Sequence, residues 1–176
     1  EANLDQLTYI PLQVEAIQAD GQVMVKVRNF TQFGGASTGR QDRYIFGRQF
    51  NGYEENYLYV IDGAGNITLT HEITPEGNMP AWLPRIGLTM TLDSSLQLVD
   101  YYGRGPEENY PDRKTGYAVG IYKNTVDGMY EPYLQPQDHG LRMDNRRMAL
   151  HNAEGLGIAV SMDALFNFNV SNYSTE

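Results

Sequence analysis

The sequence predicts an all-β protein in which antiparallel strands form a sandwich. Val23, Val25 and Val27 alternate with longer or polar side chains, which is the period of a half-buried strand. Turn signals such as Asp20-Gly21 recur between runs of this kind. No stretch has the spacing of an amphipathic helix, so two large packed antiparallel sheets are the expected architecture.

Strands are expected wherever apolar residues alternate between turn formers. Pro11 has no N–H for a central ladder, so the first strand is expected at a sheet edge. The predicted strands span residues 9–17, 22–30, 56–61, 66–73, 88–92, 96–102, 117–122, 146–151, 156–161 and 166–171. Residues 62–65 are expected to form a second hairpin turn. Connections rich in glycine or proline are expected at residues 31–39, 74–84 and 124–145, while residues 40–55 show no clear period.

Length and composition narrow the classes of function. The chain has 176 residues, which suits a single domain that can bury a hydrophobic core. Its net charge of −9 argues against nucleic acid or an anionic membrane surface as a partner. Cysteine is absent, which excludes a disulfide framework and a thiolate metal site. The 13 tyrosines fit either sugar-stacking rings or half-buried strand positions, and we favour the second interpretation.

The two ends of the sequence suggest a piece of a longer chain. It starts at Glu1 without a methionine and stops at Glu176, shortly after a strand-like run. We therefore expect a fragment of a larger multi-domain chain, truncated at its C-terminal end.

One segment, from Tyr101 to Arg113, concentrates charges, phenols and turn formers. Its two glycines allow backbone angles that other residues avoid, and its two prolines fix φ. We therefore expect an ordered loop rather than a regular element. Its candidate structural or domain-contact residues, together with one from farther along the chain, are Arg104, Glu107, Glu108, Asn109, Tyr110, Asp112, Arg113 and Arg142.

Arginines and aspartates recur around this segment and farther along the chain. The set comprises Arg104, Asp112, Arg113, Arg142, Asp144, Arg146 and Arg147. Two interpretations are open, an internal salt-bridge network that pins two long loops, or a contact with sugar or another domain. The first is favoured. It predicts that Arg104 and Arg113 pair with carboxylates of their own loop and of residues 124–145.

The same segment carries a resemblance to a known family. The run Gly-Arg-Gly-Pro-Glu-Glu-Asn-Tyr-Pro-Asp-Arg at residues 103–113 resembles a signature of the C-terminal, small-chain or domain 5-like, region of bacterial β-galactosidases in glycoside hydrolase family 2. Residues 126–133 and 136–142 fit the same family, and residues 84–88 resemble the strand before the signature. The clear match runs from about Leu58 to Tyr173, while the first third of the chain matches loosely.

This resemblance implies both a fold and a parent activity. The fold would be a galactose mutarotase-like supersandwich, formed by residues 1–176 as one domain. The parent would hydrolyse terminal non-reducing β-D-galactosides with retention. This domain would pack on the catalytic barrel, shape the rim of the sugar pocket and support a homo-oligomer. Mg²⁺ and possibly Na⁺ would bind in the catalytic domain, and the compartment stays open between bacterial cytoplasm and periplasm.

No catalytic or metal-binding residue is predicted in this chain, and no substrate-binding residue is identified. Retaining glycosidases need two carboxyls facing each other, whereas the neighbours Glu107 and Glu108 on an extended backbone point apart. Trp82 is expected to pack rather than to stack on sugar, because the family's active-site tryptophan lies nearer the C-terminus. No metal-ligand spacing relates the three histidines, His71, His139 and His151.

Two alternatives from other functional classes remain. One is a stand-alone carbohydrate-binding module. The other is a mutarotase-like epimerase, which would need a histidine and a carboxylate facing one pocket, and the sequence shows no such pairing.

Overall fold

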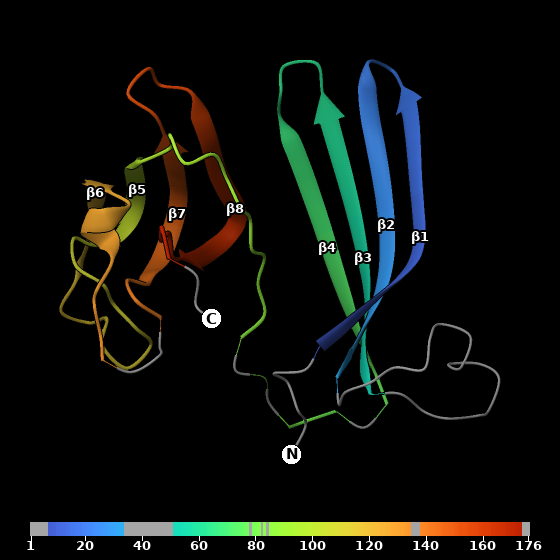
Figure 1. Ribbon diagram of the computed structural model, residues 1–176, viewed down its shortest axis with the longest axis horizontal. Helices are drawn as coiled ribbons and strands as arrows, with labels where there is room; N and C mark the ends of the chain where they lie inside the picture. The colour runs from blue at the N-terminus through green and yellow to red at the C-terminus, as the bar shows by residue number, and fades with distance from the viewer. Residues whose placement is uncertain are drawn as a thin grey trace. The chain divides into compact units, whose positions relative to one another are not determined.

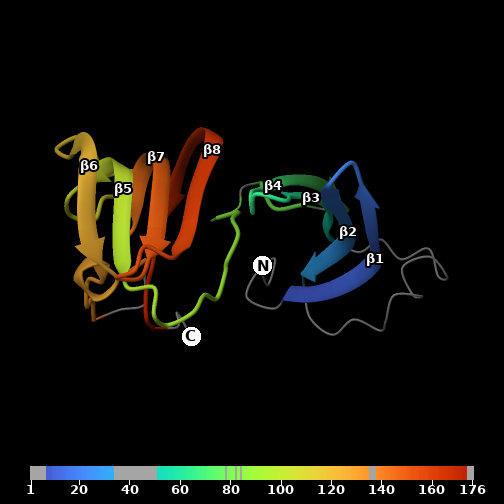
Figure 2. The same ribbon diagram turned by 90° about the horizontal axis from the view of Figure 1, so that it is seen from above.

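The structure is a computed structural model that describes residues 7–33, 51–77, 79–81, 83, 85–134 and 138–173. The chain forms two compact units, Glu1–Gly87 and Leu88–Glu176. Each unit contains one four-stranded antiparallel sheet (Figures 1 and 2). The all-β prediction is confirmed, while one supersandwich domain across both units stays a prediction. Within the described ranges, no helix has the length and apolarity needed to cross a bilayer.

Sheet A, in the first unit, follows the order of the chain (Figure 1). Its strands are β1 (Leu7–Ala19), β2 (Gln22–Phe33), β3 (Gly52–Asp62) and β4 (Ile67–Glu76). The predicted edge position of the first strand is confirmed. The β1–β2 register shifts between Pro11 and Gln13, as expected where a proline interrupts the ladder.

Local turn chemistry closes the two hairpins of sheet A. Asp20 and Gly21 have φ values of 53° and 76°, the positive pair that a type I′ turn requires. In the second hairpin, Asp62 Oδ1 accepts hydrogen bonds from the backbone N–H groups of Ala64 and Asn66, both at 2.9 Å. Both predicted hairpins are confirmed.

Sheet A extends beyond the predicted strand limits at one end. Thr31 to Phe33 continue β2 instead of starting a loop, because Gln32 still pairs with Gly52 of β3. The predicted connection at residues 74–84 is wrong at its start, since Pro75 lies within β4. A proline is tolerated there because β4 is an edge strand. The prediction for residues 34–50 falls outside the described residues.

Sheet B, in the second unit, places β5 between strands that are distant in the sequence. Its order is β6-β5-β7-β8, with β5 at Leu98–Gly105, β6 at Ala118–Thr125, β7 at Arg142–His151 and β8 at Gly157–Phe168. A short 3-10 helix, η1 (Asp127–Met129), follows β6. One buried cluster forms the core of this unit, and its members are Val99, Tyr101, Val126, Met129, Met148 and Leu150.

Three predictions for the second unit are corrected. Residues 88–92 form no strand, because no described strand pairs with them, and Leu88 and Met90 stay 55% and 58% exposed. Residues 142–145 belong to β7 rather than to a long loop. The two last predicted strands are one strand, β8, which leaves the β7 ladder over residues 162–165 and rejoins it when Phe166 pairs with Asn145.

Candidate functional site

The charged segment at residues 101–113 begins inside sheet B, since Tyr101 to Gly105 end strand β5. Tyr101 and Tyr102 belong to the strand predicted at residues 96–102, whereas the prediction of a loop is wrong for residues 103–105. Gly103 is needed for close packing rather than for a turn, because a Cβ there would overlap the side chain of Asn145. The buried Tyr101 hydroxyl donates to the carbonyl of Pro106 at 3.0 Å, and burial raises the pKa of this phenol.

Asn109 fastens the loop after β5 to the start of β7. Its side chain is fully buried, and its Nδ2 donates to the carbonyls of Arg104 and Glu107, both at 3.1 Å. Its Oδ1 accepts from the N–H of Met143 at 3.0 Å, and its own N–H donates to the carbonyl of Leu141 at 2.9 Å. The side-chain amide of Asn109 uses both its nitrogen and its oxygen in hydrogen bonds. A neutral group thus fixes the path of the loop without any charge.

Glu108 is the buried carboxylate of the loop, with a side chain only 5% exposed. It accepts hydrogen bonds from Arg113 Nη2 at 2.6 Å and from the Tyr110 hydroxyl at 2.5 Å, and it contacts the Tyr133 hydroxyl. The Tyr110 hydroxyl also contacts the carbonyl of Asp138. Burial, and then the Glu108 carboxylate, raise the pKa of Tyr110 to about 12. Arg113 therefore pairs with a carboxylate of its own loop, as predicted.

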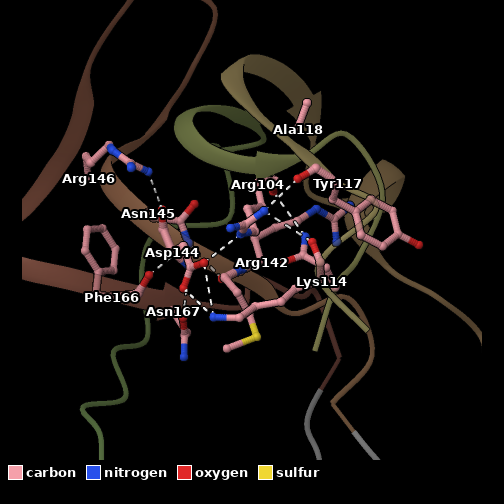
Figure 3. A network of polar contacts seen from close by, with 12 residues as sticks. Arg104, Lys114, Tyr117, Ala118, Arg142, Asp144, Asn145, Arg146, Phe166 and Asn167 are labelled. Carbon is pink, nitrogen blue, oxygen red and sulfur yellow. Dashed lines mark hydrogen bonds and ion pairs between the residues drawn. The ribbon is translucent and has the colours of Figure 1, made fainter. Parts of the chain in front are cut away.

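Arg104 forms the second ion pair, with a carboxylate on β7 (Figure 3). Its Nε donates to Asp144 Oδ2 at 2.6 Å, and Lys114 Nζ lies 3.1 Å from Asp144 Oδ1. Arg104 Nη1 also donates to the carbonyl of Tyr117 at 2.9 Å. The hydrogen bond from Arg104, supported by Lys114, lowers the pKa of Asp144. This pairing also agrees with the prediction, because Asp144 lies within residues 124–145.

Arg142 does not take part in the ion-pair network that the sequence predicted. It is 1% exposed, yet no described carboxylate pairs with it. Its Nη1 donates to the carbonyl of Gly140 at 2.8 Å, and its Nε to the carbonyl of Pro106 at 3.1 Å and to the Tyr101 hydroxyl at 3.3 Å. The salt-bridge expectation is therefore wrong here, because β7 directs this side chain toward backbone carbonyls. Hydrogen bonds to neutral oxygens offset part of the cost of burying the charge.

Comparison with known proteins shows the family of the chain that contains this polar network. The family model described as the β-galactosidase small chain matches residues 7–176, which include both units. The chain belongs to the β-galactosidase small-chain family.

Curated relatives of the small-chain family are much longer proteins. A β-galactosidase of Vibrio cholerae is 38% identical over 118 residues, which are 67% of this chain and 11% of the relative. One of Pseudoalteromonas haloplanktis is 33% identical over 134 residues, 74% of this chain and 12% of the relative. One of Priestia megaterium is 33% identical over 116 residues, 66% of this chain and 11% of the relative. The chain thus spans about an eighth or less of these relatives.

Four other residues of the predicted arginine and carboxylate set lie outside the ion pairs, two in the loop after β5 and two on β7. Glu107 and Asp112 are exposed, and neither carboxylate accepts a hydrogen bond from the described residues. Arg146 stacks over Tyr102, 5.1 Å from its ring centroid, and donates to the carbonyl of Asp144 at 2.8 Å. Arg147 is exposed.

The histidines of this small-chain protein occupy separate places. His71 stacks on Tyr57 with ring centroids 4.1 Å apart, and its Nε2 lies 3.5 Å from Glu55 Oε1. His151 Nε2 lies 3.8 Å from Asp100 Oδ2. The sequence showed neither pairing of a histidine with a carboxylate, because each depends on the register between strands.

His139 lies apart from both of these pairs. It stacks on Tyr130 with ring centroids 5.1 Å apart, and its Nδ1 lies 2.7 Å from the carbonyl of Glu131. No group of three or more histidine or acidic side chains in the described part of the chain could hold a metal ion. Trp82, for which packing was predicted, lies outside the described residues.

Sequence reasoning missed Asn145, which joins β7 to β8 where their register shifts. Asn145 is fully buried, and its Nδ2 donates to the carbonyls of Arg142 at 2.7 Å and Phe166 at 3.1 Å. The preceding residue, Asp144, has φ of 54°. Two adjacent Asx residues, which tolerate left-handed backbone and hydrogen-bond locally, were the available signal for this irregularity.

Proposed function

We propose that this chain is a non-catalytic C-terminal domain of a β-galactosidase that hydrolyses terminal non-reducing β-D-galactosides with retention. The observation that carries the proposal is the small-chain family match over residues 7–176. The relatives that share this region are named β-galactosidase and are about eight to nine times longer than the matching segment. The direct partner of the domain is then a catalytic barrel of the same polypeptide, where Mg²⁺ and Na⁺ also bind.

The geometry of the signature loop supports a non-catalytic role. Retaining hydrolysis needs two carboxyl groups about 5–5.5 Å apart, one on each side of the scissile bond. The Glu108 carboxylate is buried against Arg113 and two tyrosine hydroxyls, so it is not free to attack a sugar. Glu107 is the exposed neighbour of Glu108 in the chain.

The polar network supports a role in shaping a rim. Asn109 ties the signature loop to β7, and Arg142 joins the carbonyl of Pro106 to that of Gly140. Glu108 connects the same loop to Tyr133. Two irregular segments are thus held in one arrangement by buried groups. A surface held in this way can present fixed contacts to a substrate bound on a neighbouring domain without losing conformational entropy on binding.

Turnover of a chromogenic β-galactoside is the decisive test. We expect none from the 176-residue chain and robust turnover from the longer polypeptide that contains it. Proton NMR of the first product should show β-galactose, as retention requires. Turnover by the chain alone that Glu108→Gln or Glu107→Gln abolishes would make the loop an active site. Tight galactose binding without turnover, measured by calorimetry, would favour a carbohydrate-binding module instead.

A further inference from the structure

The chain contains three aspartate–glycine pairs, at residues 20–21, 62–63 and 127–128. At such a pair the backbone nitrogen of the glycine can attack the side-chain carboxyl carbon of the aspartate, because glycine has no Cβ to obstruct the approach. The attack requires a rotation about the Cα–C bond of the aspartate. Its rate therefore depends on how firmly the folded chain holds the pair. The structure holds the three pairs in different ways.

The pair Asp20-Gly21 forms the tip of the β1–β2 hairpin (Figure 1). In the part of the chain that the structure describes, neither the Asp20 carboxylate nor the Gly21 N–H has a hydrogen-bond partner. A Cβ at Gly21 would meet no atom within 4 Å. Residues 13–23 are all exposed, so this turn can rotate without opening any buried structure.

The pair Asp62-Gly63 also lies in an exposed hairpin turn, but its carboxylate is held on both oxygens. Oδ1 of Asp62 accepts from the N–H groups of Ala64 and Asn66, and Oδ2 accepts from Asn66 Nδ2, all at 2.9 Å. These bonds resist the rotation. The hydrogen bonds from Asn66 also lower the pKa of Asp62, so less of it carries the proton with which a carboxyl oxygen leaves as water.

The pair Asp127-Gly128 is held at both reacting groups. The Gly128 N–H donates to Thr125 Oγ1 at 3.0 Å, and Asp127 Oδ1 accepts from Asn172 Nδ2 at 2.7 Å. Both residues belong to η1, whose last residue, Met129, is fully buried in the core. A rotation at this pair would therefore disturb the packing of the second unit.

We propose that Asp20 is a site of covalent modification at which the folded chain forms an isoaspartyl linkage, because its fold leaves the two reacting groups unbound. The Gly21 nitrogen bonds to Cγ of Asp20, and its proton leaves with the hydroxyl of the protonated carboxyl as water. The product is a cyclic imide. Water then adds to either ring carbonyl. Cleavage at Cγ restores aspartate, whereas cleavage at the backbone carbonyl leaves a main chain that runs through Cβ and Cγ.

The modification lengthens the backbone of the hairpin tip by one methylene and keeps one carboxylate there. The reaction needs only the folded chain and water, so it is independent of the proposed function. Asp62 and Asp127 should stay largely unmodified under the same conditions, because their hydrogen bonds must first be broken.

Incubation of the full chain at neutral pH in water enriched in heavy oxygen tests the site, because each imide that hydrolyses gains one heavy oxygen atom. Mass spectrometry of proteolytic peptides should show incorporation at Asp20 at least about tenfold faster than at Asp62 or Asp127, since only those two need local opening. In concentrated denaturant the three rates should converge. Incorporation at Asp20 that is equal to or slower than that at Asp62 in the folded chain would overturn the proposal.

An isoaspartyl methyltransferase identifies the product, because it transfers a methyl group to the isoaspartyl carboxylate and not to aspartate. It should label the peptide that contains Asp20. Heavy oxygen at Asp20 without any methyl label would contradict the isoaspartyl linkage, since the imide would then reopen only to aspartate.

Two matched variants test the cause of the selectivity. Asp20→Glu keeps the negative charge but requires a larger ring, so it should abolish incorporation at the hairpin tip and leave Asp62 unchanged. Asn66→Ala removes a side-chain hydrogen bond to Asp62 and should raise incorporation at Asp62 without changing Asp20. Incorporation at the tip that survives Asp20→Glu would overturn the assignment. An unchanged rate at Asp62 in the Asn66 variant would contradict protection by hydrogen bonding.

Discussion

Sheets A and B contain similar strands but are stabilised in different ways. Sheet A follows the chain order, and its register shifts once, between Pro11 and Gln13. Among the described apolar side chains of its unit, only Phe30 and Phe33 are buried. Sheet B pairs strands that are distant in the sequence and has two register irregularities between β7 and β8. Nevertheless, the less regular sheet carries the buried core.

The difference shows that regular strand pairing does not by itself bury side chains. In the second unit, the irregular segment after β6 supplies Val126 and Met129, which are 3% and 0% exposed, to the core. The same unit buries Glu108, Asn109 and Arg142, each with hydrogen bonds. The irregular connections therefore cover one face of sheet B, and their polar groups must be satisfied because they are withdrawn from water.

The largest effect should come from truncating a core residue that the irregular segment supplies. Met129→Ala should destabilise the second unit by about 2–5 kcal/mol, because it leaves a cavity in a closed core. Ile67→Ala, at a position of sheet A that is 62% exposed, should cost about 0.5 kcal/mol or less. Urea unfolding, with hydrogen exchange to resolve the two units, measures both. Equal losses in the two variants would remove the contrast between the sheets.

A buried and an exposed asparagine give the next comparison. Asn109→Ala should cost about 1–3 kcal/mol, because it leaves buried backbone groups at Arg104, Glu107 and Met143 without partners. Asn66→Ala should cost less, because its side-chain bond to Asp62 is exposed. Thermal unfolding of both variants tests this order. If the Asn66 variant proved the less stable, the amide at Asn109 would not hold the signature loop.

Two arginine–glutamate pairs sharpen the comparison further. Arg113→Ala should lower the melting temperature more than Arg28→Ala, because Glu108 is 5% exposed and Glu54 is 18% exposed. Adding Glu108→Gln to Arg113→Ala should recover part of the loss, because it removes the unpaired buried charge. A double-mutant cycle on thermal unfolding checks this result. No recovery would mean that the phenols alone compensate the Glu108 carboxylate.

The smallest expected effect is a dependence on acidic pH. The hydrogen bond from Arg104 holds the pKa of Asp144 below its ordinary value of 3.8, so the folded state binds fewer protons than the unfolded state. This contribution is present above the ordinary aspartate pKa and is lost as pH falls through the lowered value. It should amount to about 1 kcal/mol or less. Asp144→Asn should flatten the loss of stability at acidic pH, as measured by urea unfolding at several pH values.

Much of the candidate site could be predicted from the sequence because its signal is local. Residues 103–113 indicated the family, and the excess of charge there predicted ion pairs of Arg104 and Arg113 with carboxylates. The partner of Arg142 could not be predicted. Its three hydrogen-bond acceptors come from β5, the loop after it and the turn before β7, which meet only in the folded chain.

By itself, the sequence determined the features that depend on local backbone preference. Asp20-Gly21 specifies its hairpin and Pro11 its edge strand, because φ and the missing N–H act within a few residues. Tertiary structure alone decided that residues 103–105 continue a strand and that residues 88–92 do not form one. Both runs have strand-like or turn-like composition, but a strand exists only where another segment satisfies its N–H and C=O groups.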